Sequence, residues 1–530
     1  MNIHETDVLV IGGGAAGMWA ALAARQEGCR VLLVSKTPLG ISTCTYLSGG
    51  MFSLPTESNP PERHRERTLQ TGKGINDPKL VQILSEEAAD RVRELERLGI
   101  PGRWEKEGFY CLGKPPAWGA PLALGLAQAC KHQGVLNLPW VGINRLWVEG
   151  GEVSGALAWD YRVGKPMAFE AKATILATGG GGALYERHDN PLQMTGDGYV
   201  LAFHAGCRLR DMEFVQFLPP GLAEPGKPPM VIAPTLCDYG KVVNSLGEDI
   251  PEKYRLTARP LAVRSRDAFS LAIFQEEQNG REVFLDLRSL TEDQWPPDNM
   301  AQTQRGILTR QLRCQERPIR ISPVCHHFMG GVAIDRDGRT DVPGLFAAGE
   351  VAGGVHGANR MGGNALSETA VFGYRAGKAA ALKAKEEKRR RLTTMVHQGL
   401  KEFEKSLLLQ EGEISFLEVK IALGKILWEK AGILRNGPGL KKALEEIHQL
   451  REERLPKIQV QNPREVLGRM EIENGLWVGE MIVRCALFRE ESRGAHFRED
   501  FPKSDDSKWK GNLFLQKSPE GMRLEFRPLD

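Results

Sequence analysis

The pattern of apolar and polar positions is clearest at the start of the chain. An apolar run at Val8–Ile11 leads into a glycine-rich stretch, GGGAAG at 12–17, and an Ala-rich amphipathic run continues through Arg25. A second apolar run then occupies Val31–Val34. Short apolar runs predict buried strands, and a 3.6-residue period predicts a helix. The stretch therefore predicts a strand, a tight turn, a helix and a second strand.

The glycines of this stretch indicate a dinucleotide site. Gly12 permits the tight turn, Gly14 lets a pyrophosphate approach the backbone, and Gly17 lets the helix pack closely on the strand. In NAD-binding proteins an acidic residue after the second strand holds the ribose, but here Ser35 and Lys36 occupy that position. This departure disfavours NAD, so the choice of dinucleotide depends on other motifs.

Two later stretches have the form of a short buried strand that ends in glycines. They are ATILATGGGG at 173–182, followed by TGDG at 195–198, and GLFAAGE at 344–350. We expect both to return the chain to the dinucleotide-binding domain. Residues 148–158 alternate like a hairpin with its turn at the glycines 150 and 151. Helical periodicity marks residues 78–98, 122–132, 365–385, 392–454 and 471–491.

Length and composition predict a globular protein of two or three domains. Of its 530 residues, 41% are hydrophobic and 26% are charged, and the formal net charge of +3 is too small to argue for nucleic acid. The run at 383–391 mixes both signs and is typical of a solvated helix end. No apolar run is long enough to span a bilayer, and the first strand leaves no room for a signal peptide. We expect a cytoplasmic protein, or one held at the cytoplasmic face of a membrane through partner subunits.

The cysteines bear on metals and disulfides. The nine cysteines are scattered and include no CxxC pair. This spacing predicts no metal site and no iron–sulfur cluster within the chain. Disulfides are not expected in a reducing compartment.

The glycine motifs and the later segments together resemble a known family over nearly the whole chain. GGGAAG, ATGGGG with TGDG, and GLFAAGE followed by HGANRMGGNAL are similar to the flavoprotein subunit of the succinate dehydrogenase and fumarate reductase family. HHFMGG at 326–331, SRGAHFREDFP at 492–502 and RLEFRP at 523–528 add to this resemblance. The resemblance implies that the dinucleotide is FAD, because Ser-Lys after the second strand is usual in that family.

The resemblance also implies a fold and a domain order. We expect an α/β protein with a Rossmann-like FAD-binding domain, an inserted α+β capping domain and a C-terminal helical domain. The FAD-binding domain is expected at 1–215 and 325–385, and the capping domain, which carries part of the substrate site, at 216–324. The helical domain is expected at 390–500, followed by a tail at 501–530.

Three residues match the family's catalytic positions. To reduce an activated double bond, a flavin enzyme must grip a carboxylate, deliver a hydride and supply a proton. His326 and Arg360 match residues that hold a substrate carboxylate, and Arg is suited to bidentate binding. Arg266 matches the family's proton donor, although by itself it would be interpreted as an arginine paired with Asp267 at a helix start. That role needs a relay and a desolvated site.

The expected FAD contacts follow the motifs. We expect the glycine-rich turn to face the pyrophosphate of FAD. Ser35 and Lys36 are expected on the adenosine side, and the loop near Thr43 is expected to lie beside the flavin ring. Asp197 and Glu350 are expected to accept hydrogen bonds from ribityl or ribose hydroxyls. The predicted cofactor residues are Gly12, Gly14, Ala15, Ala16, Gly17, Ser35, Lys36, Ser42, Thr43, Gly49, Gly50, Ala177, Thr178, Gly179, Asp197, Glu350, Asn364, Ala365 and Leu366.

Three departures from the family pattern affect the chemistry. Thr43 replaces the histidine that binds flavin covalently in respiratory enzymes, so FAD is expected to be non-covalent. Leu218 replaces a histidine that grips the second carboxylate of a dicarboxylic substrate. The Thr-Glu pair expected on the capping domain has only a poor counterpart in Thr235-Leu236. Because an unmatched buried carboxylate costs several kcal/mol, we expect a substrate with one carboxylate rather than fumarate or succinate.

Other functions remain open at this stage. L-aspartate oxidase has the same fold and non-covalent FAD but normally keeps the histidine that is Leu218 here, and the adenylylsulfate reductase flavoprotein also lacks the dicarboxylate grip. A different class is an electron-transfer protein whose flavin only relays electrons and whose site is vestigial. Retention of Arg266, His326 and Arg360 favours an enzyme. Since the chain offers no cluster ligands, we expect electrons to arrive from a partner iron–sulfur protein or a direct reductant.

Overall fold

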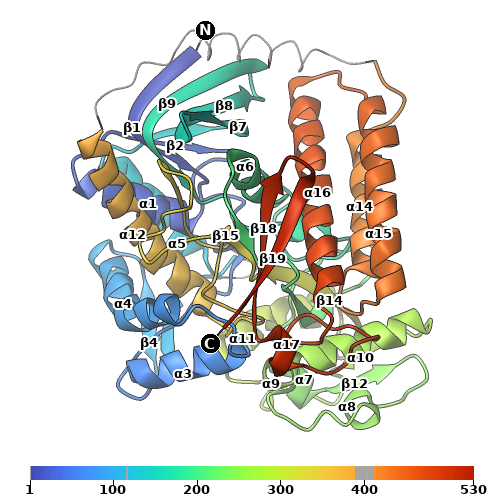
Figure 1. Cartoon of the computed structure of the whole chain (residues 1–530). Helices are drawn as coiled ribbons and strands as arrows, with labels where there is room; N and C mark the ends of the chain where they lie inside the picture. Colours follow the sequence, from blue (N-terminus) through green and yellow to red (C-terminus); the bar gives the residue numbers. More distant parts are fainter. Residues whose placement is uncertain (1, 115–116, 388–402, 404–410, 530) are drawn as a thin grey trace.

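A seven-stranded sheet forms the centre of the N-terminal part of the chain (Figure 1). The computed structural model describes residues 2–114, 117–387, 403 and 411–529. The strands lie in the order β6, β2, β1, β9, β8, β7, with β16 beside β9. Strand β1 is parallel to both β2 and β9, and Ile11 is in register with Val34 and Leu176. The strands are β1 (Asn2–Ile11), β2 (Val31–Ser35), β6 (Leu136–Pro139), β7 (Val141–Glu149), β8 (Glu152–Asp160), β9 (Lys165–Leu176) and β16 (Leu345–Ala347).

This sheet confirms the predicted Rossmann-like fold. The predicted hairpin turn is present, because Glu149 pairs with Glu152 across Gly150 and Gly151, which both have positive φ. Since β1, β2, β9 and β16 are parallel, their carboxyl ends meet at one edge of the sheet. That edge is where open α/β sheets bind ligands.

The helix α12 (Asn364–Glu386) packs tightly against α1 (Ala15–Gln26). A Cβ atom on Gly377 would lie 2.2 Å from the carbonyl oxygen of Ala20, so only glycine permits this approach. Elements of the same region are α2 (Cys44–Leu47), α3 (Pro61–Thr71), α4 (Pro78–Arg97), α5 (Ala120–His132), β3 (Met51–Ser53), β4 (Gly102–Glu105) and β5 (Gly108–Cys111). The helices predicted at 78–98, 122–132 and 365–385 correspond to α4, α5 and α12.

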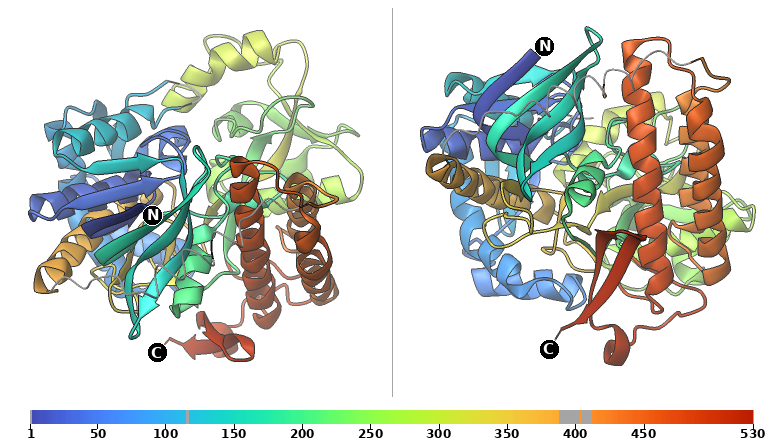
Figure 2. Two further views of the ribbon diagram at one scale, coloured as in Figure 1. Left: turned by 90° about the horizontal axis from the view of Figure 1, so that it is seen from above. Right: turned by 45° about the horizontal axis from the view of Figure 1, so that its top comes forward.

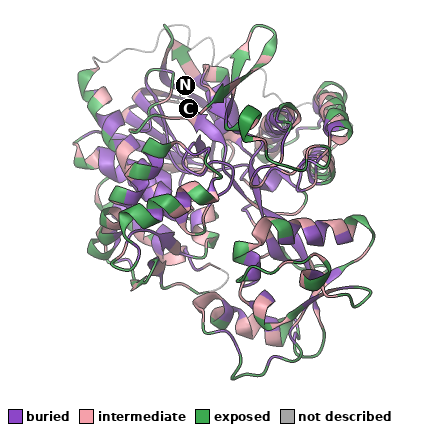
Figure 3. Cartoon of the chain, turned by 60° about the horizontal axis from the view of Figure 1, so that its bottom comes forward, coloured by how far each residue is buried: buried purple, intermediate pink, exposed green. Residues whose placement is uncertain are grey.

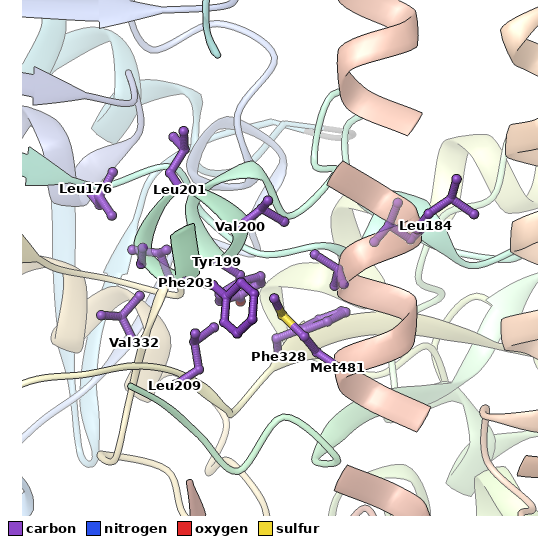
Figure 4. Close-up of a cluster of buried hydrophobic side chains, with 14 of the residues drawn as sticks. Leu176, Leu184, Tyr199, Val200, Leu201, Phe203, Leu209, Phe328, Val332 and Met481 are labelled. Atoms are coloured by element: carbon purple, nitrogen blue, oxygen red, sulfur yellow. The ribbon is translucent and has the colours of Figure 1, made fainter. Parts of the chain in front are cut away.

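The short helix α6 (Asp197–Ala205) links the N-terminal sheet to the C-terminal helices. Figure 4 shows Tyr199 and Phe203 of α6 packed near Phe328 and Met481, which come from β14 (Ile319–Phe328) and α16 (Pro463–Phe488). The rings of Tyr199 and Phe328 stack with centroids 5.9 Å apart. This buried cluster fixes the strand that carries the HHFMGG motif against the dinucleotide sheet.

A second sheet with its own hydrophobic core lies beside the first. Its strand order is β11, β14, β13, β12, and all pairs are antiparallel. It is the inserted α+β part of the fold. Its elements are β11 (Val215–Leu222), α7 (Leu236–Tyr239), β12 (Lys241–Asn244), α8 (Ile250–Lys253), α9 (Leu261–Arg264), α10 (Arg266–Gln278), β13 (Val283–Asp286), α11 (Asn299–Gly306) and β14 (Ile319–Phe328).

The C-terminal helices α14 (Phe416–Lys430), α15 (Gly437–Gln449) and α16 (Pro463–Phe488) stand side by side, on the opposite side of the molecule from α1 and α12 (Figures 1 and 2). Helix α16 begins well before the predicted 471–491, because Pro463 occupies its first turn and Asn462 caps it. The first part of the helix predicted at 392–454 lies outside the described residues.

The final segment contributes two strands to a sheet. Strand β18 (Gly511–Ser518) pairs with β10 (Leu209–Arg210) and with β19 (Gly521–Pro528). The same sheet includes β15 (Gly331–Ala333) and β17 (Ala352–Gly353).

Exposed residues lie mainly on outer helix faces and loops, and buried residues fill the sheets (Figure 3). Within the described ranges, no helix is both long and apolar enough to cross a membrane. The predicted domain boundaries stay predictions.

Candidate active site

A cavity lies at the edge where β1, β2 and β9 end. Most of the predicted cofactor residues line it, although they come from separate parts of the sequence. Those that line it are Gly12, Gly14, Ala15, Ala16, Ser35, Lys36, Ser42, Thr43, Ala177, Thr178, Gly179, Asp197 and Glu350. The fold therefore brings the three glycine-bearing strand ends to one site.

The glycine-rich turn shapes this cavity for a phosphate group. Gly12 has φ +122°, and a Cβ atom there would lie 2.1 Å from the carbonyl oxygen of Ala177. Gly14 caps α1 with no side-chain hydrogen bond, and the first turn of α1 has no acidic residue. The N–H of Ala15 donates to Oγ1 of Thr45 at 3.0 Å, and the N-terminus of α1 turns the positive end of its dipole toward the cavity. These features fit the pyrophosphate of a dinucleotide.

Some predicted cofactor residues are not among the residues that line the cavity. They are Gly17, Gly49, Gly50, Asn364, Ala365 and Leu366. A Cβ atom on Gly17 would lie 2.0 Å from the carbonyl oxygen of Gly12, so its structural role is close packing of α1 on β1. Asn364 is buried and its amide oxygen lies 3.0 Å from Nε2 of His64.

Sequence reasoning missed other residues of the cavity wall. Gln193 and Met194 directly precede the TGDG motif, and that position was an available signal. Val141 and Ile143 belong to β7 and carry no motif, so only the fold identifies them.

Lys36 is the centre of a buried ion network at this cavity. Its Nζ forms ion pairs with Asp197 and with Glu471 of α16, the latter at 2.6 Å. Burial by itself would lower the pKa of Lys36, but the two carboxylates outweigh it and raise that pKa above its usual range. Asn474 of α16 also donates to Asp197, at 2.9 Å. The helical region therefore supports two residues that line the cofactor cavity.

The predicted carboxylate-binding arginine is buried on the loop before α12. Nη2 of Arg360 donates to Oε1 of Gln216 at 2.8 Å, and its side chain is almost inaccessible to solvent. Among the described residues, Nε of Arg360 has no hydrogen-bond partner. Burial, and then the guanidinium of Arg266, lower the pKa of Arg360 to about 10. The surrounding protein thus does not fully balance the positive charge of Arg360.

Arg266 extends from the start of α10 to the same loop. Nη1 donates to the carbonyl oxygen of Arg360 at 3.2 Å, and Nη2 donates to the side chain of Asn359. Nε lies 3.5 Å from Asp267, so the simple helix-start pair is also present. The inserted region therefore contributes a second cation directly beside Arg360.

His326 lies at an irregularity in the sheet. Gln216 pairs with His327 and Phe217 pairs with Cys325, so His326 is the extra residue of a β-bulge. Bulges commonly redirect a side chain next to a functional site. Nδ1 of His326 lies 2.7 Å from Oδ2 of Asp189.

Asp189 was missed by sequence reasoning, because nothing in its local sequence distinguishes it from a loop aspartate. It follows the glycine cluster after β9, and its backbone N–H donates to the carbonyl oxygen of Cys325 at 3.3 Å. Only the tertiary structure places it beside His326.

Two further ionisable groups interact electrostatically with Arg360. Burial raises the pKa of Glu350 to about 7, although the N–H of Phe328, which donates to Oε1 at 3.0 Å, opposes that rise. Burial, and then Arg360, hold the pKa of His327 well below its usual range. His327 is therefore neutral, and Glu350 titrates near neutral pH.

The predicted departures have clear positions. Leu218 lies on β11 opposite Val324, and it offers no donor to a ligand. The hydroxyl of Thr235 donates to Oδ2 of Asp298 at 2.6 Å, within the inserted region. Cys44 follows Thr43 and lies 3.5 Å from the amide oxygen of Asn190. Burial, followed by Glu350 and Asp189, raises the pKa of Cys44 well above its usual value, so its thiol is not a reactive thiolate.

Comparisons with known proteins agree with this geometry. Residues 7–366 match the family model described as FAD binding domain, and residues 420–530 match that described as fumarate reductase flavoprotein C-term. The chain is 34% identical to one subunit of the fumarate reductase (CoM/CoB) of Methanothermobacter marburgensis, covering 98% of each chain. It is 30% identical to L-aspartate oxidase of Streptomyces coelicolor, covering 97% of this chain and 92% of the relative.

A solved structure gives the same result. The FrdA chain of E. coli quinol fumarate reductase superposes with a TM-score of 0.89 and 26% identity, covering 100% of this chain and 97% of that one. The cradle at Gly12 and the N-terminus of α1, which has no acidic residue in its first turn, fit the pyrophosphate of FAD. The chain belongs to the FAD-dependent oxidoreductase family of fumarate reductase and succinate dehydrogenase flavoproteins.

Proposed function

We propose that this protein reduces the activated double bond of an enoate that keeps one carboxylate. In this proposal Arg360 and His326 hold the carboxylate, and Arg266 supplies the proton. The proposal rests above all on one observation: Arg360 is buried directly beside Arg266, and its Nε has no partner among the described residues. A bound carboxylate would supply the missing negative charge and a planar pair of acceptors.

FAD, when bound, supplies the hydride, and the residues of this chain orient the substrate and move the proton. Asn359 and Gln216 fix the two guanidinium groups, since the amide oxygen of Asn359 accepts from Arg266 and that of Gln216 accepts from Arg360. Asp267 is a candidate relay to Arg266, because its side chain is 37% exposed and lies 3.5 Å from Nε of Arg266. Burial of the site strengthens each of these electrostatic contacts.

The attachment of FAD follows from residue 43. Thr43 caps α2 by accepting a hydrogen bond from the N–H of Tyr46 at 3.1 Å. A threonine side chain cannot form the histidyl bond to flavin, and we propose that FAD is bound non-covalently. Precipitation of the protein with acid should release all of its flavin into the supernatant. Flavin that stays with the pellet would contradict non-covalent binding.

A second candidate substrate is fumarate itself, because the relative from M. marburgensis is named a fumarate reductase. Against it, Leu218 provides no donor and Thr235 is engaged with Asp298. L-aspartate oxidation remains a further candidate on the basis of the relative of that name. An electron-transfer role without substrate turnover would leave the arginine pair without a function.

The relative from M. marburgensis is named as one subunit of its enzyme, which supports the proposal that this chain also works within a complex. We propose an iron–sulfur partner, since the nine cysteines have no cluster spacing and all are free. We further propose that the complex works in the cytoplasm or at the cytoplasmic face of a membrane. Purification of the native complex with iron analysis would test the partner.

The substrate class is tested by reoxidation of the reduced flavin. Photoreduced protein is mixed anaerobically with one acceptor at a time, and flavin absorbance is followed. The acceptors are fumarate, crotonate, adenylylsulfate, and iminoaspartate, the oxidation product of L-aspartate, which is generated in the reaction mixture. We expect crotonate or another monocarboxylic enoate to reoxidise the flavin fastest. The variant Leu218→His, which adds a donor at the distal end, should shift the ratio of rates toward fumarate by about tenfold. Strong preference for fumarate in the unmodified protein would contradict the one-carboxylate proposal, and no reoxidation by any acceptor would favour electron transfer.

A further inference from the structure

We propose that Asp189 is a positioning residue that fixes the tautomer of His326, so that the protein binds a substrate carboxylate only when His326 carries two protons. This inference rests on the proposed function, because it assumes that His326 contacts a carboxylate. The Asp189–His326 pair has no counterpart in the motifs discussed above. Its evidence is the geometry of one loop, which comprises residues 188–190, and one strand, β14.

The first step is the direction of the hydrogen bond between Asp189 and His326. Nδ1 of His326 lies 2.7 Å from Oδ2 of Asp189, and the Asp189 side chain is largely buried. An ionised carboxylate can only accept, so Nδ1 carries the proton. The neutral form of His326 therefore has its lone pair on Nε2.

The second step concerns the atom left for a ligand. The His326 side chain is 30% exposed, and its hydrogen bond within the described part of the chain is made by Nδ1, which leaves Nε2 for a ligand. A lone pair on Nε2 would face the oxygens of a carboxylate, which is repulsive. Only the doubly protonated ring donates from Nε2 to a carboxylate while Nδ1 still donates to Asp189. Binding of a carboxylate is thus coupled to uptake of one proton.

The third step is the way in which Asp189 itself is held. The side-chain amide of Asn190 donates to Oδ1 of Asp189 at 2.9 Å and to the carbonyl oxygen of His326 at 3.0 Å. A carbonyl oxygen only accepts, so the orientation of the Asn190 amide is determined by this contact. The atom of residue 189 that faces Asn190, Oδ1, must therefore be an acceptor. The second terminal atom of that side chain, Oδ2 in the aspartate, faces His326.

These contacts make Asp189→Asn a sharp test. In that variant the amide nitrogen of Asn190 still needs an acceptor, so the amide oxygen of residue 189 points toward Asn190. The amide nitrogen of residue 189 then faces Nδ1 of His326. An amide nitrogen donates, so Nδ1 becomes the acceptor and the neutral ring carries its proton on Nε2. Neutral His326 could then donate to a carboxylate, and binding would no longer require proton uptake.

Other ionisable groups around the Asp189–His326 pair could also change binding with pH. The charge of Asp189 acts on His188, Cys325, Glu350, Arg360 and Cys44. His327, the next residue on β14, is acted on by His326 and by Arg266 of α10. Of these, Glu350 titrates near neutral pH. The variants must therefore separate His326 from Glu350.

The experiment measures the Kd of crotonate from the perturbation of the oxidised flavin spectrum in the holoenzyme between pH 6 and 9. In the unmodified protein we expect Kd to rise about tenfold per pH unit once His326 loses its second proton. In Asp189→Asn the Kd should vary less than about threefold over that part of the range. His326→Gln should be equally flat, because its amide always donates. Glu350→Gln should keep the steep slope, and so should the charge-removal control Glu186→Gln, at an exposed residue three positions before Asp189.

A second measurement does not depend on any substrate. Nitrogen-15 NMR of histidine-labelled protein at high pH should show the His326 proton on Nδ1 in the unmodified protein and on Nε2 in Asp189→Asn, with the signal assigned by its loss in His326→Gln. An unchanged tautomer, or an unchanged slope of Kd in Asp189→Asn, would overturn the inference. If no carboxylate perturbs the flavin while the tautomer does switch, the proposed function fails and the positioning of His326 by Asp189 stands.

Discussion

The cofactor cavity and the proposed substrate site each contain a largely buried cation, but they balance its charge in opposite ways. At the cavity, Lys36 forms ion pairs with Asp197 and Glu471. At the substrate site, Arg360 has another arginine, Arg266, as its close neighbour, and its pKa falls to about 10. Buried charges without compensation destabilise a fold.

We propose that this difference separates a structural cation, Lys36, from a functional one, Arg360. The protein itself completes the surroundings of Lys36, and we expect its removal to affect stability and cofactor retention first. The arginine pair is completed only by an anionic ligand, and we expect its removal to affect binding and turnover without lowering stability. Substitutions at the two sites should therefore give opposite profiles.

The largest expected effect is on turnover in Arg266→Ala. Loss of the proton donor should slow reoxidation of the reduced flavin by the preferred enoate by roughly a thousandfold, because general acid catalysis contributes about 10²–10⁴. The FAD content and the melting temperature should stay unchanged. The matched control is Arg264→Ala, an exposed arginine two positions earlier. Equal losses in both variants would contradict a specific role for Arg266.

The next effect is on stability in Lys36→Met. This change leaves Asp197 and Glu471 buried without their cation, and breaking a buried ion pair in this way costs about 3–5 kcal/mol. We expect a melting temperature lower by several degrees and weaker retention of FAD on dilution. Lys385→Met removes a lysine from an ion pair with Glu27 in which the lysine is half exposed, and it should have little effect. Equal melting temperatures for Lys36→Met and the unmodified protein would show that the network is not structural.

The variant Arg360→Met tests the opposite side of the comparison. Loss of the carboxylate partner should weaken crotonate binding by about 30-fold or more, which corresponds to at least about 2 kcal/mol. Since the folded protein disfavours the charge of Arg360, the melting temperature of the ligand-free protein should stay the same or rise. Flavin-perturbation titration and thermal unfolding measure the two quantities. A clear loss of stability would mean that Arg360 is structural.

The last effect, which appears only as the pH is changed, is on the stability of Glu350→Gln. The pKa of Glu350 is about 7 in the fold and near 4.5 when unfolded, so the folded protein binds more protons between these values. The stability of the apoprotein should therefore fall as the pH rises from about 4.5 to 7, by up to about 3 kcal/mol from this group. Glu350→Gln should flatten that fall, which a series of melting curves would show. An unchanged slope would assign the pH dependence to other groups.

The cofactor site could be predicted further from sequence than the substrate site could. Gly12, Gly14 and the strand ends near Ala177 and Glu350 lie in short contiguous motifs whose spacing dictates a local backbone shape. The cavity follows once these strands are parallel. Arg266, His326 and Arg360 could be predicted only through family resemblance, because no local pattern joins residues from three distant segments.

By itself, the sequence determined that a strand, a glycine turn and a helix open the chain and form a dinucleotide site, because these features depend on neighbouring residues. Only the tertiary structure decided that Glu471 supports Lys36 and that Asp189 holds His326. Such contacts depend on packing between segments far apart in the chain. The physical reason is that a local pattern fixes backbone shape, whereas the charge balance of a buried group depends on whatever the fold places beside it.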